Sequence, residues 1–365
     1  MKALRTGVTT GLCAAAAAKG AAIMLLTSKP AVQVEVEARN GEVKHFTITD
    51  AMLGSGFAQC AVQKDAGDDP DVTNGMKVFA TLTRTAGNGI EIDGGEGIGR
   101  VTKPGLKVPV GEAAINPVPR EMIRASVEEI CRQCAYTGGL KALISIPGGE
   151  VVARKTLNGR LGIEGGLSVL GTTGIVEPMS EKAILETIKT EIDVLIAAGK
   201  ESLLITPGNY GRDFAKNVLG LDMETAIKCS NFIGETLDHV MLRDSTRIIL
   251  IGHAGKLVKL AGGVMHTHSS VADCRMEIIA VHCALAGAST DTIRQIMDCV
   301  TVEAAISLMK AVGVNDAVWQ SIGRKIGYHL HGRTKGRLSV EYIVFTQEEG
   351  VLVHERTDVS SGDIL

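Results

Sequence analysis

The sequence predicts an α/β protein with two domains: an α+β N-terminal domain over residues 1–180 and a Rossmann-like α/β domain with a parallel sheet over residues 181–365. Three observations support this. The length of 365 residues suits two domains at roughly 150 residues each. The first half mixes hairpin signals with helical segments. In the second half, short apolar runs alternate with helical patterns, which is typical of a parallel sheet.

The first domain begins with a loop at residues 5–11, and the alanine-rich segment after it predicts a helix over residues 12–26. Alternation of apolar and polar residues predicts the next two strands, joined at the turn-forming pair Asn40 and Gly41. The strands expected in this half lie at residues 32–38, 43–48, 57–64, 77–84, 89–92, 140–146 and 167–170.

The second domain is expected to alternate strands and helices from residue 180 onward. Its expected elements are a helix at 180–198, a strand at 202–206, a glycine loop with a helix after it, a strand at 226–229, a helix at 232–242 and a strand at 247–251. The chain is then mainly helical to about residue 335, and strands at 338–345 and 351–354 form a final hairpin.

Composition excludes several classes of protein. The net charge of −3 and the 3% aromatic content argue against a nucleic-acid partner, which would need basic and stacking side chains. No window of 18 uncharged, strongly apolar residues is present, so we expect no membrane span. The eight cysteines lack the paired spacing of a zinc site, so we expect reduced thiols, no bound metal and a cytoplasmic location.

Two glycine loops at expected strand ends, residues 207–211 and 252–256, are the main candidates for a cofactor site. Ligands of parallel sheets bind beyond the carboxyl ends of the strands, and glycine lets the backbone approach them closely. Neither loop has the dinucleotide or P-loop pattern, so the cofactor stays open at this point. The candidate cofactor-binding residues are Gly208, Asn209, Tyr210, Gly211, Asn231, Gly252, Gly255 and Lys256.

The first domain contains two further candidate sites. Thr9 or Thr10 can cap the first helix beside Arg5, a combination that favours a carboxylate or phosphate, although a well-capped core helix explains it equally well. The acidic segment 64–71 could bind a hard cation or be a solvated turn, and it fails the spacing of an EF-hand.

Several motifs, taken together, resemble one family. They occupy residues 5–19, 64–71, 94–99, 103–105, 114–120, 155–158, 160–163, 170–180, 207–211, 252–256 and 267–269. In number, order and spacing they resemble the cobalt-precorrin-5B C1-methyltransferase family, CbiD, of anaerobic cobalamin biosynthesis. The chain departs from the expected pattern at Val8, Leu12 and Asn74.

The resemblance implies transfer of a methyl group from S-adenosylmethionine, a cosubstrate, to C-1 of cobalt-precorrin-5B, giving cobalt-precorrin-6A. Cobalt would enter only as part of this corrinoid. We expect the adenosyl part on the second domain and the corrinoid carboxylates mainly on the first. The candidate substrate-binding residues are Arg5, Thr9, Thr10, Lys64, Lys103, Arg120, Lys155, Arg160, Thr172, Thr173 and His268.

His253 and Asp65 are the candidates for a base that accepts any proton lost after methylation. Two other functions are weighed against the methyltransferase: a non-catalytic corrinoid carrier and a nicotinamide-dependent oxidoreductase. The missing dinucleotide fingerprint disfavours the oxidoreductase. A homo-oligomer is left open.

Overall fold

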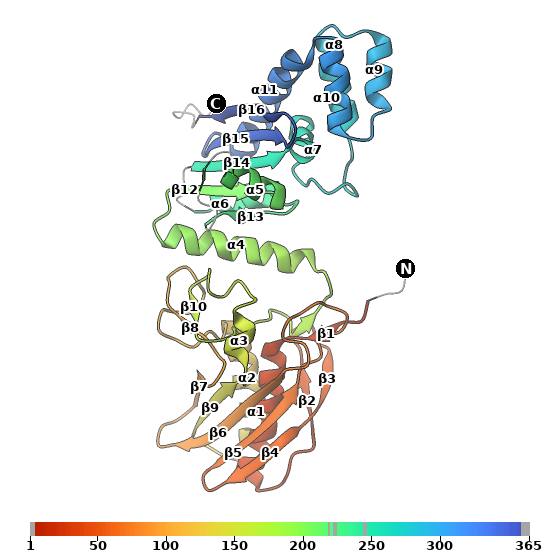
Figure 1. The fold of residues 1–365 in the computed structure, drawn as a ribbon. Helices are drawn as coiled ribbons and strands as arrows, with labels where there is room; N and C mark the ends of the chain where they lie inside the picture. The colour runs from red at the N-terminus through yellow and green to blue at the C-terminus, as the bar shows by residue number, and fades with distance from the viewer. Residues whose placement is uncertain (1–3, 218–219, 222–224, 244–246, 359–365) are drawn as a thin grey trace. The chain divides into compact units, whose positions relative to one another are not determined.

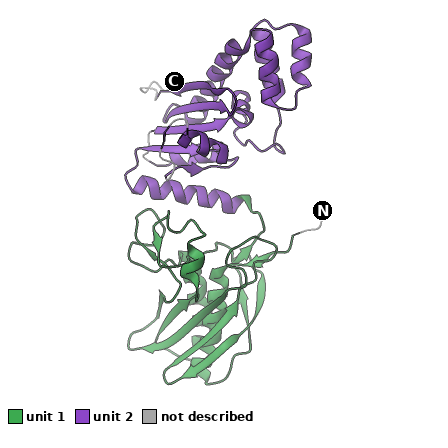
Figure 2. Ribbon diagram, viewed as in Figure 1, with its two compact units in different colours: residues 1–181 green, residues 182–365 purple. Residues whose placement is uncertain are grey.

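The computed structural model describes residues 4–217, 220–221, 225–243 and 247–358. The chain divides into two compact units, residues 1–181 and 182–365 (Figure 2). We place the boundary between residues 180 and 181 from the sequence, and the structural division falls between residues 181 and 182. The expected mixed α/β architecture, with parallel strands, is confirmed.

Unit 1 is built around a five-stranded sheet (Figure 1). In spatial order its strands are β4 (Thr49–Gly54), β5 (Phe57–Gln63), β6 (Lys77–Thr85), β9 (Gly139–Ser145) and β7 (Ile90–Gly94). Neighbouring strands are antiparallel except β7 and β9, which are parallel. The predicted hairpin forms a separate pair, β2 (Gln33–Glu37) and β3 (Val43–Thr47), and Gly41 in its turn has a φ of 85°.

Helix α1 (Thr10–Thr27) is the centre of unit 1, where it contacts α2 (Pro117–Gln133) and strands β5 and β6. Its residues Ala14 to Ala18 are completely buried. Small side chains permit this close packing, because a Cβ added at Gly20 would lie 2.8 Å from Ile48. By length and composition α1 could also cross a membrane, but 78% of it is buried inside the unit, as in a core helix.

Shorter elements complete unit 1. They are the antiparallel pair β1 (Gly7–Val8) and β11 (Ile175–Val176), the antiparallel pair β8 (Arg100–Val101) and β10 (Ile163–Glu164), and helix α3 (Gly149–Ala153). The strand expected at residues 167–170 is wrong. Leu167 and Val169 form only isolated bridges, to Ile98 and Ile115 respectively, so no continuous ladder develops.

Unit 2 contains a second five-stranded sheet. In spatial order its strands are β13 (Ile227–Lys228), β12 (Ser202–Thr206), β14 (Arg247–His253), β15 (Ser339–Thr346) and β16 (Gly350–Thr357). The first four are parallel, and β16 returns antiparallel to β15 as the expected final hairpin. After β12 the chain adds β13 on one side and then β14 on the other, so the direction of winding reverses between β12 and β14.

Helices connect these strands and form the rest of unit 2. They are α4 (Glu181–Ala197), α5 (Asn209–Asn217), α6 (Ile233–Met241), α7 (Ala254–Leu257), the 3₁₀ helix η1 (Val258–Gly262), α8 (Arg275–Leu285), α9 (Thr290–Met297), α10 (Val302–Ala311) and α11 (Asn315–Thr334). The core includes the only tryptophan, Trp319 of α11, which is 2% exposed. The second half therefore folds around its own apolar core.

Candidate functional site

Three loops meet at the carboxyl ends of the parallel strands in unit 2. The Lys256 ammonium, on α7, donates to the carbonyl of Pro207 at 3.2 Å and to Oδ1 of Asn231 at 2.9 Å. Pro207 follows β12, Asn231 follows β13, and Lys256 follows β14. One side chain thus joins both predicted glycine loops to Asn231. Because β12, β13 and β14 are parallel, their carboxyl ends lie at one edge of the sheet.

The glycines of these loops differ in what surrounds them. Among the described residues, a Cβ built on Gly208 meets nothing within 4 Å, so this part of the loop faces open space. At Gly211 a Cβ would lie 2.9 Å from the Ile251 carbonyl, and at Gly252 it would lie 2.7 Å from Leu257. Gly208 is therefore open for a ligand to approach closely, whereas Gly211 and Gly252 are required by packing inside the protein.

Three other candidates lie beside these glycines. Asn209 begins α5 and is exposed. Tyr210 follows it and is 63% exposed. Gly255 lies in α7, where a Cβ would approach only the His253 ring, at 3.4 Å. Each of these positions leaves a side chain or backbone group open to a bound molecule.

His253 caps α7 and has contacts at both ring nitrogens. Its Nδ1 accepts a hydrogen bond from the Gly255 backbone N–H at 3.2 Å, and its Nε2 lies 3.3 Å from Oε1 of Glu303. The ring also packs edge-on against Phe345, with centroids 5.7 Å apart. These contacts give His253 a structural role, and action as a base would require one of them to break.

A depression of about 390 Å³ lies beside Lys256. Its lining combines predicted residues with residues that the sequence did not suggest: Asn231, Gly255, Lys256, Lys259, Thr267, His268, Ser269, Asp273 and Arg275. His268, expected among the substrate-binding residues, belongs to unit 2 beside the cofactor loops, and its Nδ1 lies 2.6 Å from the Ser270 hydroxyl.

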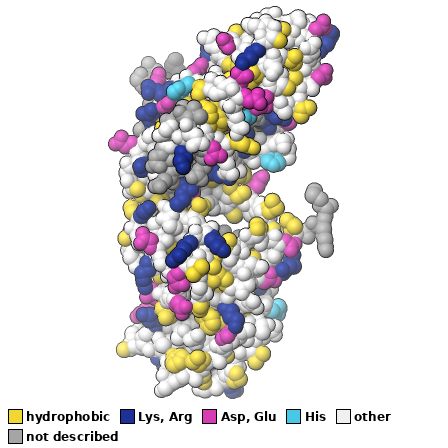
Figure 3. All heavy atoms as spheres, viewed as in Figure 1, with side chains coloured by type: hydrophobic (Ala, Val, Ile, Leu, Met, Phe, Trp, Pro, Cys, Tyr) yellow, Lys and Arg dark blue, Asp and Glu magenta, His cyan; other side chains and the backbone are white. Residues whose placement is uncertain are grey.

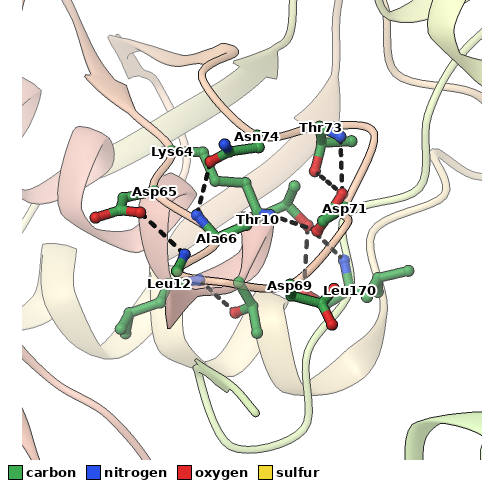
Figure 4. Close-up of polar contacts among 12 residues, drawn as sticks. Thr10, Leu12, Lys64, Asp65, Ala66, Asp69, Asp71, Thr73, Asn74 and Leu170 are labelled. Carbon is green, nitrogen blue, oxygen red and sulfur yellow. Dashed lines mark hydrogen bonds and ion pairs between the residues drawn. The ribbon is translucent and has the colours of Figure 1, made fainter. Parts of the chain in front are cut away.

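In unit 1 the segment from Lys64 to Asn74 forms a tightly hydrogen-bonded loop (Figure 4). Lys64 is 2% exposed, and its Nζ lies 2.5 Å from Oδ2 of Asp71. Burial alone would raise the pKa of Asp71, but hydrogen bonds from Lys64 and Thr73 bring it below the usual value. The Lys64 ammonium is thus held inside the loop, which argues for a structural role instead of a clamp on substrate. Asn74, a departure from the family pattern, accepts from the Ala66 N–H at 2.9 Å.

The other acids of this loop also have protein partners. Asp68 accepts from the backbone N–H of Arg5 at 2.7 Å, and Asp69 accepts from the N–H of Met179 at 3.1 Å. In the described part of the chain, no three histidine, cysteine or acidic side chains are grouped as a metal site would need. The acidic segment therefore acts here as a framework of hydrogen bonds.

Asp65 forms a two-point ion pair with Arg5, at 2.5 and 2.9 Å. This hydrogen bonding, with a further bond from the Gly67 N–H, lowers the pKa of Asp65 to about 2. A carboxylate with so low a pKa is a weak base near neutral pH. These contacts argue against Asp65 as the catalytic base, and they pair Arg5 with a carboxylate of the protein.

The threonines before α1 fix the start of this helix. Thr9 Oγ1 accepts from the Leu12 N–H at 3.2 Å, which makes it the N-cap. Thr10 Oγ1 accepts from the Leu170 N–H at 3.1 Å and donates to its carbonyl at 3.3 Å. Both threonines are buried, and Leu12 is fully buried. Leu12, another departure from the family pattern, thus lies in the core.

Arg120 is bound by the protein itself. Its guanidinium donates to the backbone carbonyls of Ile92, Ala113 and Ile115 and to the carboxylate of Glu112. Four of its five N–H groups are thus used. Arg120 therefore fixes the start of α2, and these contacts argue against a role in binding substrate.

The remaining candidates of unit 1 are more accessible. Lys103, Lys155, Arg160 and Thr172 are exposed, and Thr173 is half-buried with its hydroxyl bonded to Ile175. Lys103 lies against the turn that follows Arg160, since a Cβ at Gly162 would be 2.5 Å from the Lys103 side chain. On the face drawn in Figure 3, Lys and Arg side chains are interspersed with Asp and Glu side chains.

Comparison with known proteins identifies the class to which this fold and these loops belong. The CbiD family model matches residues 1–178, and the model of the CbiD C-terminal domain matches residues 266–356. The chain belongs to the CbiD family.

Named relatives resemble the chain over almost its full length. The cobalt-precorrin-5B C(1)-methyltransferase of Ruminiclostridium cellulolyticum is 50% identical over 94% of this chain and 90% of that protein. The protein of the same name from Alkaliphilus metalliredigens is 43% identical over 97% and 93% respectively. A crystal structure of the cobalamin biosynthesis protein CbiD from Archaeoglobus fulgidus shares 32% identity, covering 71% of this chain and 80% of that one with a TM-score of 0.39.

Proposed function

We propose that this chain methylates C-1 of cobalt-precorrin-5B with S-adenosylmethionine, giving cobalt-precorrin-6A in anaerobic cobalamin biosynthesis. The observation that carries this proposal is the 50% identity, over 94% of the chain, to a relative named for this reaction. The family match at both ends of the chain supports it.

The arrangement of side chains suits methyl transfer. S-adenosylmethionine supplies a methyl group on a sulfonium centre, whose leaving group is neutral. The protein then has to align the acceptor carbon with the methyl group and exclude water, and it needs no nucleophile of its own. This requirement agrees with the engagement of His253 and Asp65 in structural contacts.

We place the methyl donor at the strand ends of unit 2, in a Rossmann-like domain. The reversal of winding between β12 and β14 is where open parallel sheets bind nucleotide-like ligands. Open space at Gly208 leaves room for an adenosyl group, and the exposed ring of Tyr210 offers an apolar face beside it. Asn231 and Lys256 supply polar groups to orient the ligand.

We assign the corrinoid carboxylates to unit 1. Lys103, Lys155 and Arg160 are its exposed candidate cations, and they can form charge-assisted hydrogen bonds with carboxylates. A cytoplasmic location is part of the proposal, in keeping with eight free cysteines.

Anaerobic incubation of the purified protein with cobalt-precorrin-5B and isotope-labelled S-adenosylmethionine tests the function. Mass spectrometry of the corrinoid should find one labelled methyl group, and fragmentation should locate it at C-1. Tight corrinoid binding without transfer would contradict the proposal and indicate a carrier. Binding of a nicotinamide cofactor in place of S-adenosylmethionine would indicate the oxidoreductase.

A further inference from the structure

The depression beside Lys256 has more positive than negative charge. Its lining contains the cations Lys256, Lys259 and Arg275 and one carboxylate, Asp273. Arg275 and Asp273 form a two-point ion pair at 2.6 and 2.9 Å, so they largely compensate each other. Asp273 also lies within ion-pair distance of Lys259, so a single carboxylate faces three cations and the lining keeps an excess of positive charge.

Lys259 is the less common feature, because it is an ammonium only 3% exposed. Its Nζ donates to the backbone carbonyls of Thr267 at 3.2 Å and Ala272 at 2.7 Å. Asp273 lies 3.9 Å away, beyond hydrogen-bond distance. Burial of a charge against neutral partners is costly, so a buried cation of this kind usually meets an anion.

Lys256 is half-buried, and its hydrogen bonds also go to uncharged groups. Both of its acceptors, the Pro207 carbonyl and the Asn231 amide oxygen, are neutral. Burial also lowers the pKa of Lys256. Over the described residues no carboxylate is hydrogen-bonded to either lysine, and each ammonium uses two of its three N–H donors. One donor on each lysine is left for a ligand.

We propose that this depression binds a carboxylate of one of the two reactants, held by Lys256 and Lys259 with Arg275 at its rim. The inference rests on the proposed function, in which both reactants carry carboxylates: S-adenosylmethionine at its amino-acid end and the corrinoid at its side chains. Asn231 and Gly255 line both this depression and the strand-end site, so the carboxylate is bound next to the place assigned to the adenosyl group.

Calorimetric binding measurements on the full-length protein can test the carboxylate site. The probes are S-adenosylhomocysteine, 5′-methylthioadenosine, which lacks the amino-acid part, and cobalt-precorrin-5B under anaerobic conditions. The variants are Lys259→Met and Arg275→Gln. Arg275 is 28% exposed, so its variant keeps the test open if the buried Lys259 substitution prevents folding. Arg294→Gln is the matched control, since Arg294 is 73% exposed on α9 and forms its ion pair with Asp291 of the same helix.

Loss of a charge-assisted bond predicts a roughly 10- to 100-fold weaker affinity for one probe. If the site binds the carboxylate of the methyl donor, both variants should lose affinity for S-adenosylhomocysteine and keep their affinity for 5′-methylthioadenosine. If the site binds a carboxylate of the corrinoid, both variants should lose affinity for cobalt-precorrin-5B alone. Unchanged affinity for all probes in folded variants would overturn the carboxylate site. Absence of methyl transfer by the unaltered protein, with the variants still losing affinity, would instead overturn the proposed function alone.

Discussion

The substitution Asp71→Asn should destabilise unit 1, because it leaves the Lys64 ammonium buried without its counterion. Lys64 is 2% exposed and the two groups are 2.5 Å apart. Removing one partner of a buried ion pair costs about 3–5 kcal/mol. The Asp71 side chain is 26% exposed, so water screens part of the attraction, and we expect about 3 kcal/mol, the low end of that range.

Lys64→Met should cost less, about 1 kcal/mol, because the remaining Asp71 carboxylate reaches water and keeps its bonds from Thr73. The double variant should resemble Lys64→Met, which gives a coupling free energy of about 3 kcal/mol. Folding lowers the pKa of Asp71. Its ionised carboxylate therefore contributes fully to the free energy of unfolding at a pH above its pKa in the unfolded chain, about 3.9, and this contribution is lost as the pH falls through its pKa in the folded protein. Asp71→Asn should therefore lose less stability on acidification than the unaltered protein.

Urea unfolding followed by far-UV circular dichroism measures the free energy of unfolding of these three variants. Fluorescence of Trp319, the only tryptophan, reports on unit 2 and is the internal control. A loss below about 1 kcal/mol in Asp71→Asn would refute the reasoning, as would additive effects in the double variant.

Three further predictions concern the sites and the turns. Gly208→Val should weaken S-adenosylhomocysteine binding at least about tenfold by calorimetry, with an unchanged unfolding midpoint, because its side chain would occupy open space in the loop; normal affinity would remove this loop from the donor site. Arg160→Glu should weaken corrinoid binding about tenfold without affecting S-adenosylhomocysteine, and the reverse result would contradict the assignment of the two units. Gly97→Ala should cost about 3 kcal/mol or more in urea unfolding, because φ is 73° and the Cβ would lie 1.8 Å from the Ile146 carbonyl. Gly41→Ala, at a φ of 85° with open space around it, should lower the free energy of unfolding by only about 1 kcal/mol. Equal losses in the two variants would contradict the steric argument, because they would show that the backbone at Gly97 moves away from Ile146 at little cost.

Turn residues and the alternation of apolar and polar side chains predicted most of the strands, because the strands that formed follow these local sequence patterns. The pair Asn40 and Gly41 marks the hairpin turn, and alternation marks β5 and β6. Strand β4 gave no such signal, because its residues are mostly exposed and Asp50 has a φ of 50° that breaks the regular pattern. The apolar run at 167–170 suggested a strand, but its residues bridge to two different segments in turn.

The sequence predicted the candidate site only where the order of strands and helices along the chain brings residues to the same edge of the sheet. The alternation of strands and helices brings Pro207, Asn231 and Lys256 to one edge of the sheet, as expected. Arg5 and Lys64 looked like ligand-binding cations, but the loop from Lys64 to Asn74 supplies a carboxylate to each of them. The partner of Arg5 is 60 residues away in the sequence, so no local spacing rule reveals this pair. Lys259 was missed, although a single lysine between Val258 and Leu260 is an available signal for a buried charge.

The burial of α1 has a consequence for the order in which unit 1 is completed during synthesis. Residues 10–27 leave the ribosome before the strands and the helix that cover α1, which are contributed by residues 57–63, 77–85 and 117–133. An apolar helix made early therefore waits for partners made much later, and such long-range contacts slow folding and expose surfaces that aggregate. Newly made unit 1 should accordingly depend on chaperones that shield apolar helices until more than a hundred further residues have emerged.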